Sequence, residues 1–254
     1  MKKIINLVAF LPFLAFSQEI IKIKKVSGIY YLSNDISPKQ AKELAVIEAK
    51  TEALRKAGIG ETVNSSKVLI STENNNIVNQ LFNNIATVEL NGAITKYKVD
   101  TIFERRNEFS QTYFEAFITA DVIKYKTKPD PSFQLQIDGV DKVYNQGSDL
   151  KFSCTPFIAG YLKIFQITSN YAGMIYPNEF ENSTLFIKDQ KVQFPIKKGL
   201  SYSLDDIESN TLVFVFTKSE IPFTVKQTIE GITEWIYKIS PEQRQVQSFS
   251  IMVK

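Results

Sequence analysis

The sequence predicts an α+β protein in which a helix packed on an antiparallel sheet is followed by a β-sandwich domain with one C-terminal helix. Three observations predict this fold class. Residues 37–57 have the spacing and end signals of a single long helix. Apolar residues alternate with polar ones in segments on both sides of it, as in strands. Beyond residue 131, short apolar segments are separated by Gly, Pro, Asn and Asp at the spacing of a sandwich.

The first 17 residues have the pattern of a secretory signal peptide. Two lysines precede an apolar run over residues 4–16, and Ala15 and Ser17 put small residues where a signal peptidase acts. A membrane anchor would need about 20 apolar residues, and Gln18 ends this run early. We therefore expect cleavage between Ser17 and Gln18, and a periplasmic or secreted protein. No cysteine stands at the junction, so lipidation is not expected.

Composition is consistent with a soluble mature chain that has a domain at residues 18–128 and a second at residues 129–254. Hydrophobic residues make up 44% of the sequence, and no later apolar run is long enough for a transmembrane segment. Removal of the two leader lysines leaves 28 basic and 27 acidic residues. This balance gives no electrostatic case for binding nucleic acid.

The helix is expected to begin at Ser37 and to end near Ala57. Ser37 can act as the cap, Pro38 suits the first helical position, and Gln40 completes a capping box. Gly58 then provides a stop. Small residues recur every fourth position inside it, at Ala41, Ala45, Ala49, Ala53 and Ala57. Such a stripe favours close packing on a sheet; a partner-binding face is the alternative.

Strands should supply that sheet. An extended segment covers residues 20–32. Alternation predicts two further strands, one with Tyr97, Val99, Thr101 and Phe103 and one with Phe114, Ala116, Ile118, Ala120 and Val122. The charged residues 104–108 between them are expected at an exposed hairpin tip. A strand is also expected at residues 68–72, and a short helix or ordered loop at residues 74–84.

The boundary between the two domains is expected at residues 126–131, because Pro129 and Pro131, two prolines in three residues, stop both a helix and a central strand. Strands are predicted at residues 133–137, 149–154, 160–168, 173–176, 191–194 and 211–217. The unbroken apolar run at residues 212–216 predicts a buried central strand. Val225, Ile229, Ile232, Ile236 and Ile239 predict an amphipathic helix beside Trp235, and Phe249, Ile251 and Val253 a closing strand.

The chemical content excludes several kinds of active site. The chain has no histidine, so histidine-based triads and the usual zinc and haem ligand sets are excluded. Its one cysteine, Cys154, alternates with Phe152 and is expected to be a buried thiol. Ser148 and Lys151 have a serine-lysine nucleophile spacing, but they lie where a turn enters a strand, so they should point to opposite faces.

Acidic residues cluster in two short segments, at residues 138–141 and 205–208. The first contains an Asp-Gly pair, which favours a turn. The second lacks the alternating ligands and central glycine of a calcium loop. We therefore expect no catalytic, metal-binding or cofactor-binding residues and no cofactor.

The first domain contains a series of short motifs: Glu48-Ala49-Lys50, Glu52-Ala53-Leu54, Ala57-Gly58-Ile59, Asn91-Gly92-Ala93-Ile94 and Tyr97-Lys98-Val99. With these motifs it resembles the amino-terminal domain of flagellar assembly protein T and related small bacterial envelope lipoproteins. The resemblance covers residues 29–125, and the chain departs from the lipoproteins in lacking their lipidated cysteine. The resemblance implies an exported envelope component that is not an enzyme.

The second domain contains the segments Tyr144-Asn145-Gln146-Gly147-Ser148-Asp149-Leu150, Gly160-Tyr161-Leu162, Gly173-Met174-Ile175-Tyr176-Pro177-Asn178 and Phe194-Pro195. With these segments it resembles the bacterial domain of unknown function four-three-eight-four. Ser148 is inserted, and residues 170–173 replace the family's Asp-Gly turn. The resemblance implies a β-sandwich attached to other modules. The leader also resembles those of exported Gram-negative proteins, especially from the Bacteroidota.

Three functions are compatible with these features. The favoured one is an exported, non-catalytic envelope protein that binds another protein or a cell-wall component. The first alternative is a carbohydrate-binding or small-ligand-binding sandwich, which exposed aromatic residues on one face would support. Tyr171 and Tyr176, beside predicted turns, are the candidate ligand-surface residues. The second alternative is a histidine-free hydrolase that uses two carboxylates.

Overall fold

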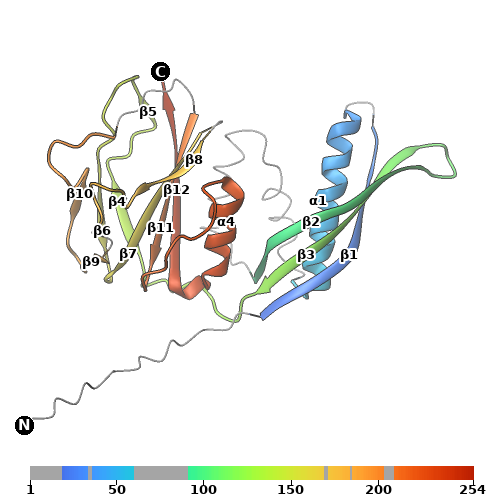
Figure 1. Ribbon diagram of the computed structural model, residues 1–254, viewed down its shortest axis with the longest axis horizontal. Coiled ribbons are helices and arrows are strands. Elements are labelled where there is room, and N and C mark those ends of the chain that lie inside the picture. Colours follow the sequence, from blue (N-terminus) through green and yellow to red (C-terminus); the bar gives the residue numbers. More distant parts are fainter. Residues whose placement is uncertain (1–18, 34–35, 60–90, 169–170, 184, 203–208) are drawn as a thin grey trace, which may run out of the picture.

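The structure is a computed structural model that describes residues 19–33, 36–59, 91–168, 171–183, 185–202 and 209–254. It has the predicted α+β fold class. Two regions lie side by side along the long axis of the molecule (Figure 1). The described residues between 19 and 124 form the helix-on-sheet region, and those between 135 and 253 form the sandwich region.

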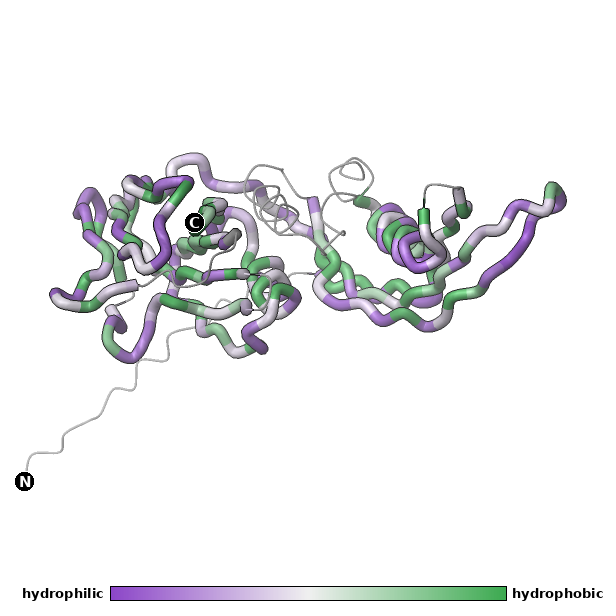
Figure 2. Tube along the Cα trace, turned by 90° about the horizontal axis from the view of Figure 1, so that it is seen from above, coloured by the Kyte–Doolittle hydropathy of each residue, from purple (hydrophilic) through white to green (hydrophobic). Residues whose placement is uncertain are grey.

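The helix-on-sheet region is built on one antiparallel sheet with the strand order β1-β3-β2. Its elements are β1 (Glu19–Tyr31), α1 (Pro38–Lys56), β2 (Gly92–Arg106) and β3 (Thr112–Lys124). β2 and β3 form a long hairpin that projects beyond α1 (Figures 1 and 2). Three of the charged residues expected at its tip, Glu104, Arg105 and Arg106, lie instead at the end of β2.

Helix α1 has the predicted ends. The Ser37 hydroxyl accepts a hydrogen bond from the Gln40 backbone N at 3.2 Å, and the Gln40 side chain accepts one from the Ser37 backbone N at 2.9 Å. Pro38 is the first helical residue, and the helix closes at Ala57. Gly58 follows with a φ of 77°, which glycine adopts without the steric penalty of other residues.

The alanine stripe of α1 packs on the sheet, as expected. Ala41, Ala45, Ala49 and Ala53 are fully buried. The closest approach is at Gly28 of β1, where a Cβ atom would lie 2.0 Å from the Ala49 backbone N. The helix therefore rests on the sheet at a distance that only small side chains on both partners allow.

Alternation along β3 is regular, whereas alternation along β2 is interrupted. Phe114, Ala116, Ile118, Ala120 and Val122 are all buried under α1, as predicted. The pairing of β2 with β3 shifts between Ile94 and Lys96 and again between Val99 and Thr101. Tyr97 and Val99 therefore pair with residues on the α1 side of β3, while Phe103 pairs with Glu115 on the other side. The prediction that these alternating β2 residues share one face of the sheet is therefore wrong, because the register shifts change the side to which they point.

The sandwich region consists of two sheets. The smaller has the order β10-β6-β4 and contains β10 (Val192–Phe194), β6 (Phe152–Pro156) and β4 (Leu135–Asp138). The larger has the order β5-β12-β11-β7-β8 and contains β5 (Val143–Tyr144), β12 (Arg244–Val253), β11 (Ser209–Thr217), β7 (Gly160–Ile167) and β8 (Ala172–Tyr176), with β9 (Leu185–Phe186) paired to β7. Six predicted strands begin within three residues of their expected starts, whereas the closing strand, expected from Phe249, begins five residues earlier at Arg244. β5 and β9 were not predicted, because a two-residue strand carries no periodicity.

Stacked phenylalanines fill the space between these sheets. Phe133 stacks on Phe216 with ring centroids 4.7 Å apart, and Phe152 stacks on Phe194 at the same distance. The residues of the 212–216 run are at most 1% exposed, which confirms the predicted buried central strand. Cys154 lies in the same core, and burial raises the pKa of its thiol far above the usual range. It is the buried thiol that the sequence predicts.

Helix α4 (Ile229–Lys238) packs on the outer face of the larger sheet. It begins four residues after Val225, the expected first apolar position, because Thr228 caps it by accepting a hydrogen bond from the Gly231 backbone N at 3.1 Å. A short turn, η1 (Pro241–Gln243), connects α4 to β12. Neither helix in the described part of the chain is long and apolar enough to cross a membrane.

The two regions share a packed junction. Ala93 and Ile123 of the helix-on-sheet region lie in the same apolar cluster as Trp235 of α4. The Tyr125 hydroxyl donates a hydrogen bond of 2.7 Å to the Tyr237 carbonyl oxygen. The segment with Pro129 and Pro131 is also held in place, since Lys218 Nζ lies 2.5 Å from Asp130 Oδ2. The segment predicted as the domain boundary therefore packs against the sandwich region through this ion pair.

Several expectations lie outside the described residues. These are the leader with its junction at Ser17 and Gln18, the strand at residues 68–72, the segment at residues 74–84 and the acidic residues at 205–208.

Candidate functional site

In the part of the chain that the structure describes, the sheet of the helix-on-sheet region has one face under α1 and one face that is largely uncovered. The even-numbered residues 114–122 of β3 point toward α1, so the odd-numbered ones point to the opposite side. Viewed from above, α1 lies on only one side of these strands (Figure 2). We call the other side the open face. Among the described residues, α4 covers it only near Ala93 and Ile123.

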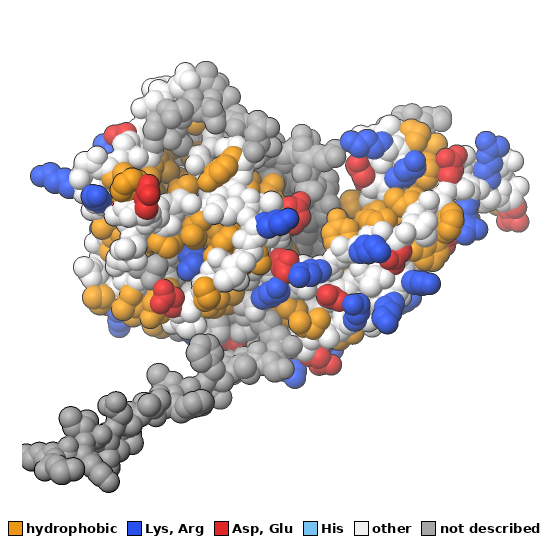
Figure 3. Space-filling model, in the orientation of Figure 1, with side chains coloured by type: hydrophobic (Ala, Val, Ile, Leu, Met, Phe, Trp, Pro, Cys, Tyr) orange, Lys and Arg blue, Asp and Glu red, His pale blue; other side chains and the backbone are white. Residues whose placement is uncertain are grey.

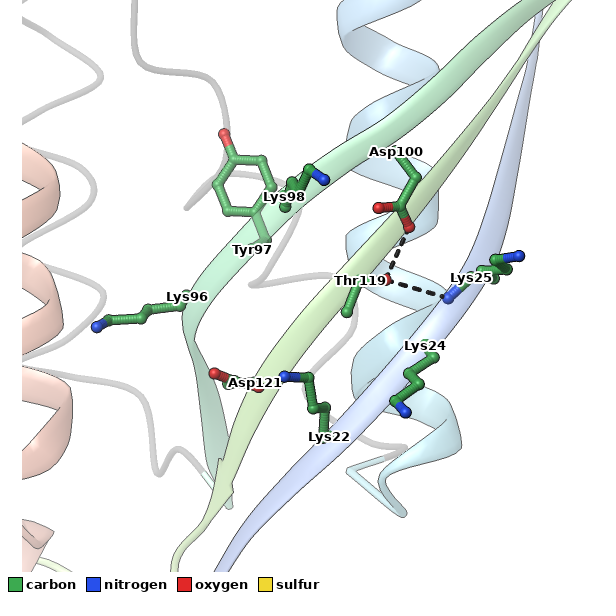
Figure 4. Close-up of a pocket in the computed structure, with 9 residues that line it drawn as sticks. All are labelled: Lys22, Lys24, Lys25, Lys96, Tyr97, Lys98, Asp100, Thr119 and Asp121. Carbon is green, nitrogen blue, oxygen red and sulfur yellow. Dashed lines mark hydrogen bonds between the residues drawn. The ribbon is translucent and has the colours of Figure 1, made fainter.

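A groove of about 680 Å³ lies on the open face. Its lining comes from all three strands and consists of Lys22, Lys24, Lys25, Lys96, Tyr97, Lys98, Asp100, Thr119 and Asp121 (Figure 4). We call it the lysine groove. All five lysines are exposed, and the ammonium groups of Lys22, Lys24, Lys25 and Lys98 face solvent, whereas Lys96 pairs with Glu234 of α4.

Irregularities in the two outer strands shape this groove. The pairing of β1 with β3 shifts between Ile23 and Val26, so the two lysines of the Lys24-Lys25 pair have no regular partner in β3. Lys25 has a φ of 49°, which is uncommon for a residue other than glycine. Asp100 occupies the second shift in β2. Such bulges redirect side chains that a regular strand would place elsewhere.

Hydrogen bonds and charges tie the groove together. Thr119 at its centre accepts a hydrogen bond from the Lys25 backbone N at 3.5 Å and donates one of 2.7 Å to Asp100 Oδ2. At the edge facing the sandwich, Lys96 Nζ lies 3.2 Å from Glu234 Oε1 of α4. Five lysines against two aspartates leave the lining with three excess positive charges. Lys and Arg side chains gather visibly on this region (Figure 3).

An aromatic patch continues the open face toward the hairpin end. It consists of Ile29, Tyr31, Phe103, Tyr113 and Phe117, which the strand register places on this side. The rings of Tyr31 and Tyr113 have centroids 5.3 Å apart, and those of Phe103 and Phe117 are 6.1 Å apart and edge to face. Ile29, Tyr31 and Phe103 are 45 to 46% exposed. The patch therefore presents ordered apolar surface to solvent.

Ion pairing fixes one side of the aromatic patch. Arg105 Nε lies 2.8 Å from Glu115 Oε2, and its guanidinium carbon lies 5.2 Å from the Phe103 ring centroid. Both contacts hold the planar guanidinium beside the ring. The aromatic surface is thus bordered by charge on the hairpin side as well as on the side of the groove.

Lys50 of α1 lies behind the groove, at the junction of the two regions. Its Nζ is 3.6 Å from the centroid of the Tyr97 ring. Burial lowers the pKa of Lys50 to about 8, while Glu230 of α4 raises it. Burial also raises the pKa of the Tyr97 hydroxyl, with a smaller contribution from Glu230 in the same direction.

The two tyrosines predicted from the sequence occupy different environments. Tyr171 is half exposed beside a turn, and its role as a ligand-surface residue remains a prediction. Tyr176 cannot belong to such a surface, because it is fully buried and packs edge to face on Phe194 at 4.9 Å. Its hydroxyl donates a hydrogen bond to the Ser183 carbonyl oxygen. The turn residues around it gave no sign of this burial.

The other candidate chemistry is not assembled. Ser148 lies in a turn, where its backbone N donates to the Asn145 carbonyl oxygen, and Lys151 Nζ is 3.3 Å from Asp149 Oδ2. The predicted turn at Asp138-Gly139 has a φ of 87° at Gly139. Within the described ranges, no three Cys, Asp or Glu side chains gather at a spacing that could hold a metal ion.

The sequence contains a signal for the lysine groove that periodicity of apolar residues does not detect. Lys22 and Lys24 alternate in one predicted strand, and Lys96 and Lys98 alternate in another. Alternate cations in two strands indicate a basic stripe once those strands are known to flank a third. The strand order β1-β3-β2 of the structure shows that these two strands do flank a third.

Comparison of the chain with models of known protein families and with curated proteins finds no match. The resemblances of the two domains therefore remain predictions, and the arrangement of the open face is the basis for the function proposed below.

Proposed function

We propose that this protein is an exported, non-catalytic component of the bacterial cell envelope that binds a partner protein or a cell-wall component through its open face. The signal-peptide pattern of residues 1–17 supports export to the periplasm or beyond. The absence of histidine, which removes the commonest general base, supports a binding role over a catalytic one.

One observation carries the proposal: an ordered aromatic patch and a basic groove lie on the same sheet face, which the described residues leave largely uncovered. Apolar sheet faces are normally buried against another layer, as both faces of the larger sandwich sheet are. Tyr31 and Phe103 instead keep almost half of their surface in water. Contiguous exposed apolar surface with a polar border is typical of binding sites.

A purely protective role explains only part of this surface. Lysines and bulges on edge strands prevent unwanted pairing with other chains, and Lys22, Lys24 and Lys98 all lie on edge strands. This role gives no reason for Phe103 and Tyr31 to lie exposed on the same face. A binding surface accounts for both the lysines and the aromatic residues.

The test uses the mature protein, residues 18–254, as bait for envelope extracts and for purified cell-wall sacculi. In the Tyr31→Ser, Phe103→Ser double variant, we expect capture of the partner to fall at least about tenfold, because a central aromatic anchor contributes about 1.4 kcal/mol or more. The matched control is the Phe157→Ser, Phe180→Ser variant, which removes two aromatic residues of similar exposure from the sandwich region.

Circular dichroism should show that both double variants fold. Loss of capture in the Tyr31→Ser, Phe103→Ser variant alone would support the open face as the binding surface. Binding to sacculi rather than to a protein would identify a cell-wall component as the partner. Equal capture by the wild type and both variants would overturn the proposal.

A further inference from the structure

We infer that the lysine groove and the aromatic patch together bind an extended polypeptide segment that carries both acidic and apolar side chains. This inference rests on the proposed function and specifies the chemical class of the partner. It requires that both parts of the surface contact the same ligand, that the ligand be negatively charged and that its anions be carboxylates.

The two parts are contiguous along one strand. Thr119 of the groove and Phe117 of the patch are successive open-face residues of β3, so about 7 Å separates them along the strand. β3 has 13 residues and therefore extends over roughly 43 Å. A ligand that contacts lysines and aromatic rings at once must be elongated and must carry charged and apolar groups in succession. An extended polypeptide meets both requirements.

Charge selects an acidic ligand. When Glu234, the partner of Lys96, is counted with the two aspartates, the five lysines leave an excess of two positive charges, which stands out in a mature chain with 28 basic and 27 acidic residues. The groove is exposed, so the attraction acts over roughly 10 Å at moderate ionic strength and weakens with added salt. Binding should therefore depend on salt.

The choice of cation distinguishes carboxylates from phosphates and sulfates. All five cations of the groove are lysines, and none is an arginine. Arginine binds phosphate through two parallel hydrogen bonds from its planar guanidinium, whereas lysine acts as a hydrated point charge. Asp100 and Asp121 lie among the lysines and would repel a doubly charged phosphate more strongly than a carboxylate. The lining thus favours glutamate and aspartate side chains over a nucleic acid or a phosphorylated glycan.

The probe is a fluorescein-labelled peptide of about twelve residues, long enough to cover β3, with glutamates in one half for the lysine groove and leucines in the other half for the aromatic patch. Fluorescence anisotropy measures its binding to the mature protein at about 0.05 M and about 0.5 M NaCl. The test variant is Lys22→Gln, Lys24→Gln, Lys98→Gln. Lys96 is left unchanged because it pairs with Glu234 of α4.

The matched control neutralises three exposed lysines of α1, on the other side of the sheet, as Lys39→Gln, Lys42→Gln, Lys56→Gln. We expect the groove variant to raise the Kd at least about tenfold and the control to raise it less than about twofold. High salt should weaken wild-type binding at least about tenfold. A peptide with glutamine in place of glutamate should bind the wild type about as weakly as the acidic peptide binds the groove variant.

Equal binding of the acidic peptide by the wild type and the groove variant would overturn the inference. Tighter binding of heparin or of a thymidine oligonucleotide than of the peptide would overturn it too. The two proposals fail under different results. If the groove variant still captures an envelope partner that the Tyr31→Ser, Phe103→Ser variant does not, the open face remains the binding surface. Only the inference that its ligand is acidic is then refuted.

Discussion

The larger sheet of the sandwich and the sheet under α1 differ in how many of their faces are covered. β11 is buried on both faces, with Leu212, Phe214 and Phe216 toward the smaller sheet and Val213 and Val215 toward α4. Apart from Ile123, which packs under α4, β3 is buried only on the face toward α1, and its other face carries partly exposed residues such as Phe117 and Thr119. A strand that is apolar at every position belongs to a structural layer, whereas an alternating strand leaves a face available for binding.

The largest expected effect comes from replacing one phenylalanine by alanine in each of these two sheets. Phe214→Ala should lower the free energy of unfolding by about 3 to 5 kcal/mol, because it leaves a cavity beside Phe152 and Phe249. Phe103→Ala should cost less than about 1 kcal/mol, since nearly half of that side chain already contacts water. Urea unfolding monitored by the fluorescence of Trp235, the single tryptophan, measures both.

Similar losses in the two phenylalanine variants would contradict this comparison. They would mean that the open face is covered in the folded protein, and the binding proposal would then lose its surface.

The second effect concerns Lys50, which lies where the two regions meet. Its pKa in the folded protein is about 8, below the ordinary lysine value of 10.5, because burial disfavours the ammonium form. Between these two values the unfolded chain binds more protons than the folded one, so stability rises with pH. From pH 8 to 10.5 we expect the wild type to gain up to about 3 kcal/mol relative to Lys50→Met.

Urea unfolding of both proteins across this pH range provides the measurement. Glu230→Gln sharpens it, because Glu230 raises the pKa of Lys50 and its removal should move the start of the gain to lower pH. Parallel profiles for the wild type and Lys50→Met would show that Lys50 is solvated and that the junction is looser than described.

The third effect compares the two faces of one strand. Gly28→Ala should destabilise the protein by about 1 to 3 kcal/mol, because the new methyl group would overlap the Ala49 backbone and push α1 away. Its neighbour Ser27 lies on the open face, and Ser27→Ala should change stability by less than about 0.5 kcal/mol. Thermal unfolding measures both. A tolerated alanine at residue 28 would mean that α1 is not held closely on β1.

Local patterns predicted most of the elements. The cap at Ser37 and the stop at Gly58 set the limits of α1, because both act through hydrogen bonds and backbone conformations within a few residues. The apolar run of β11 and the alternation in β3 placed their buried faces correctly. The candidate site was not predicted in the same way: Tyr176, chosen for its position beside a turn, belongs to the core.

The lysine groove depends on pairing between strands that are distant in sequence. β1 and β3 are separated by about 90 residues, as the contact from Lys25 to Thr119 illustrates. The register shifts that bring Lys24, Lys25 and Asp100 to the groove are properties of that pairing. A single extra residue reverses the side to which the following side chains point, so alternation within one strand cannot locate it.

The sequence by itself determined the helix ends, the alanine stripe and the buried strands, because each follows from interactions within one element or from how much of it must leave water. The tertiary structure alone decided which sheet face α1 covers and which residues share the open face. The physical reason is that coverage depends on which elements pack together, and five exposed lysines become one positive groove only when β3 holds β1 and β2 on either side of it.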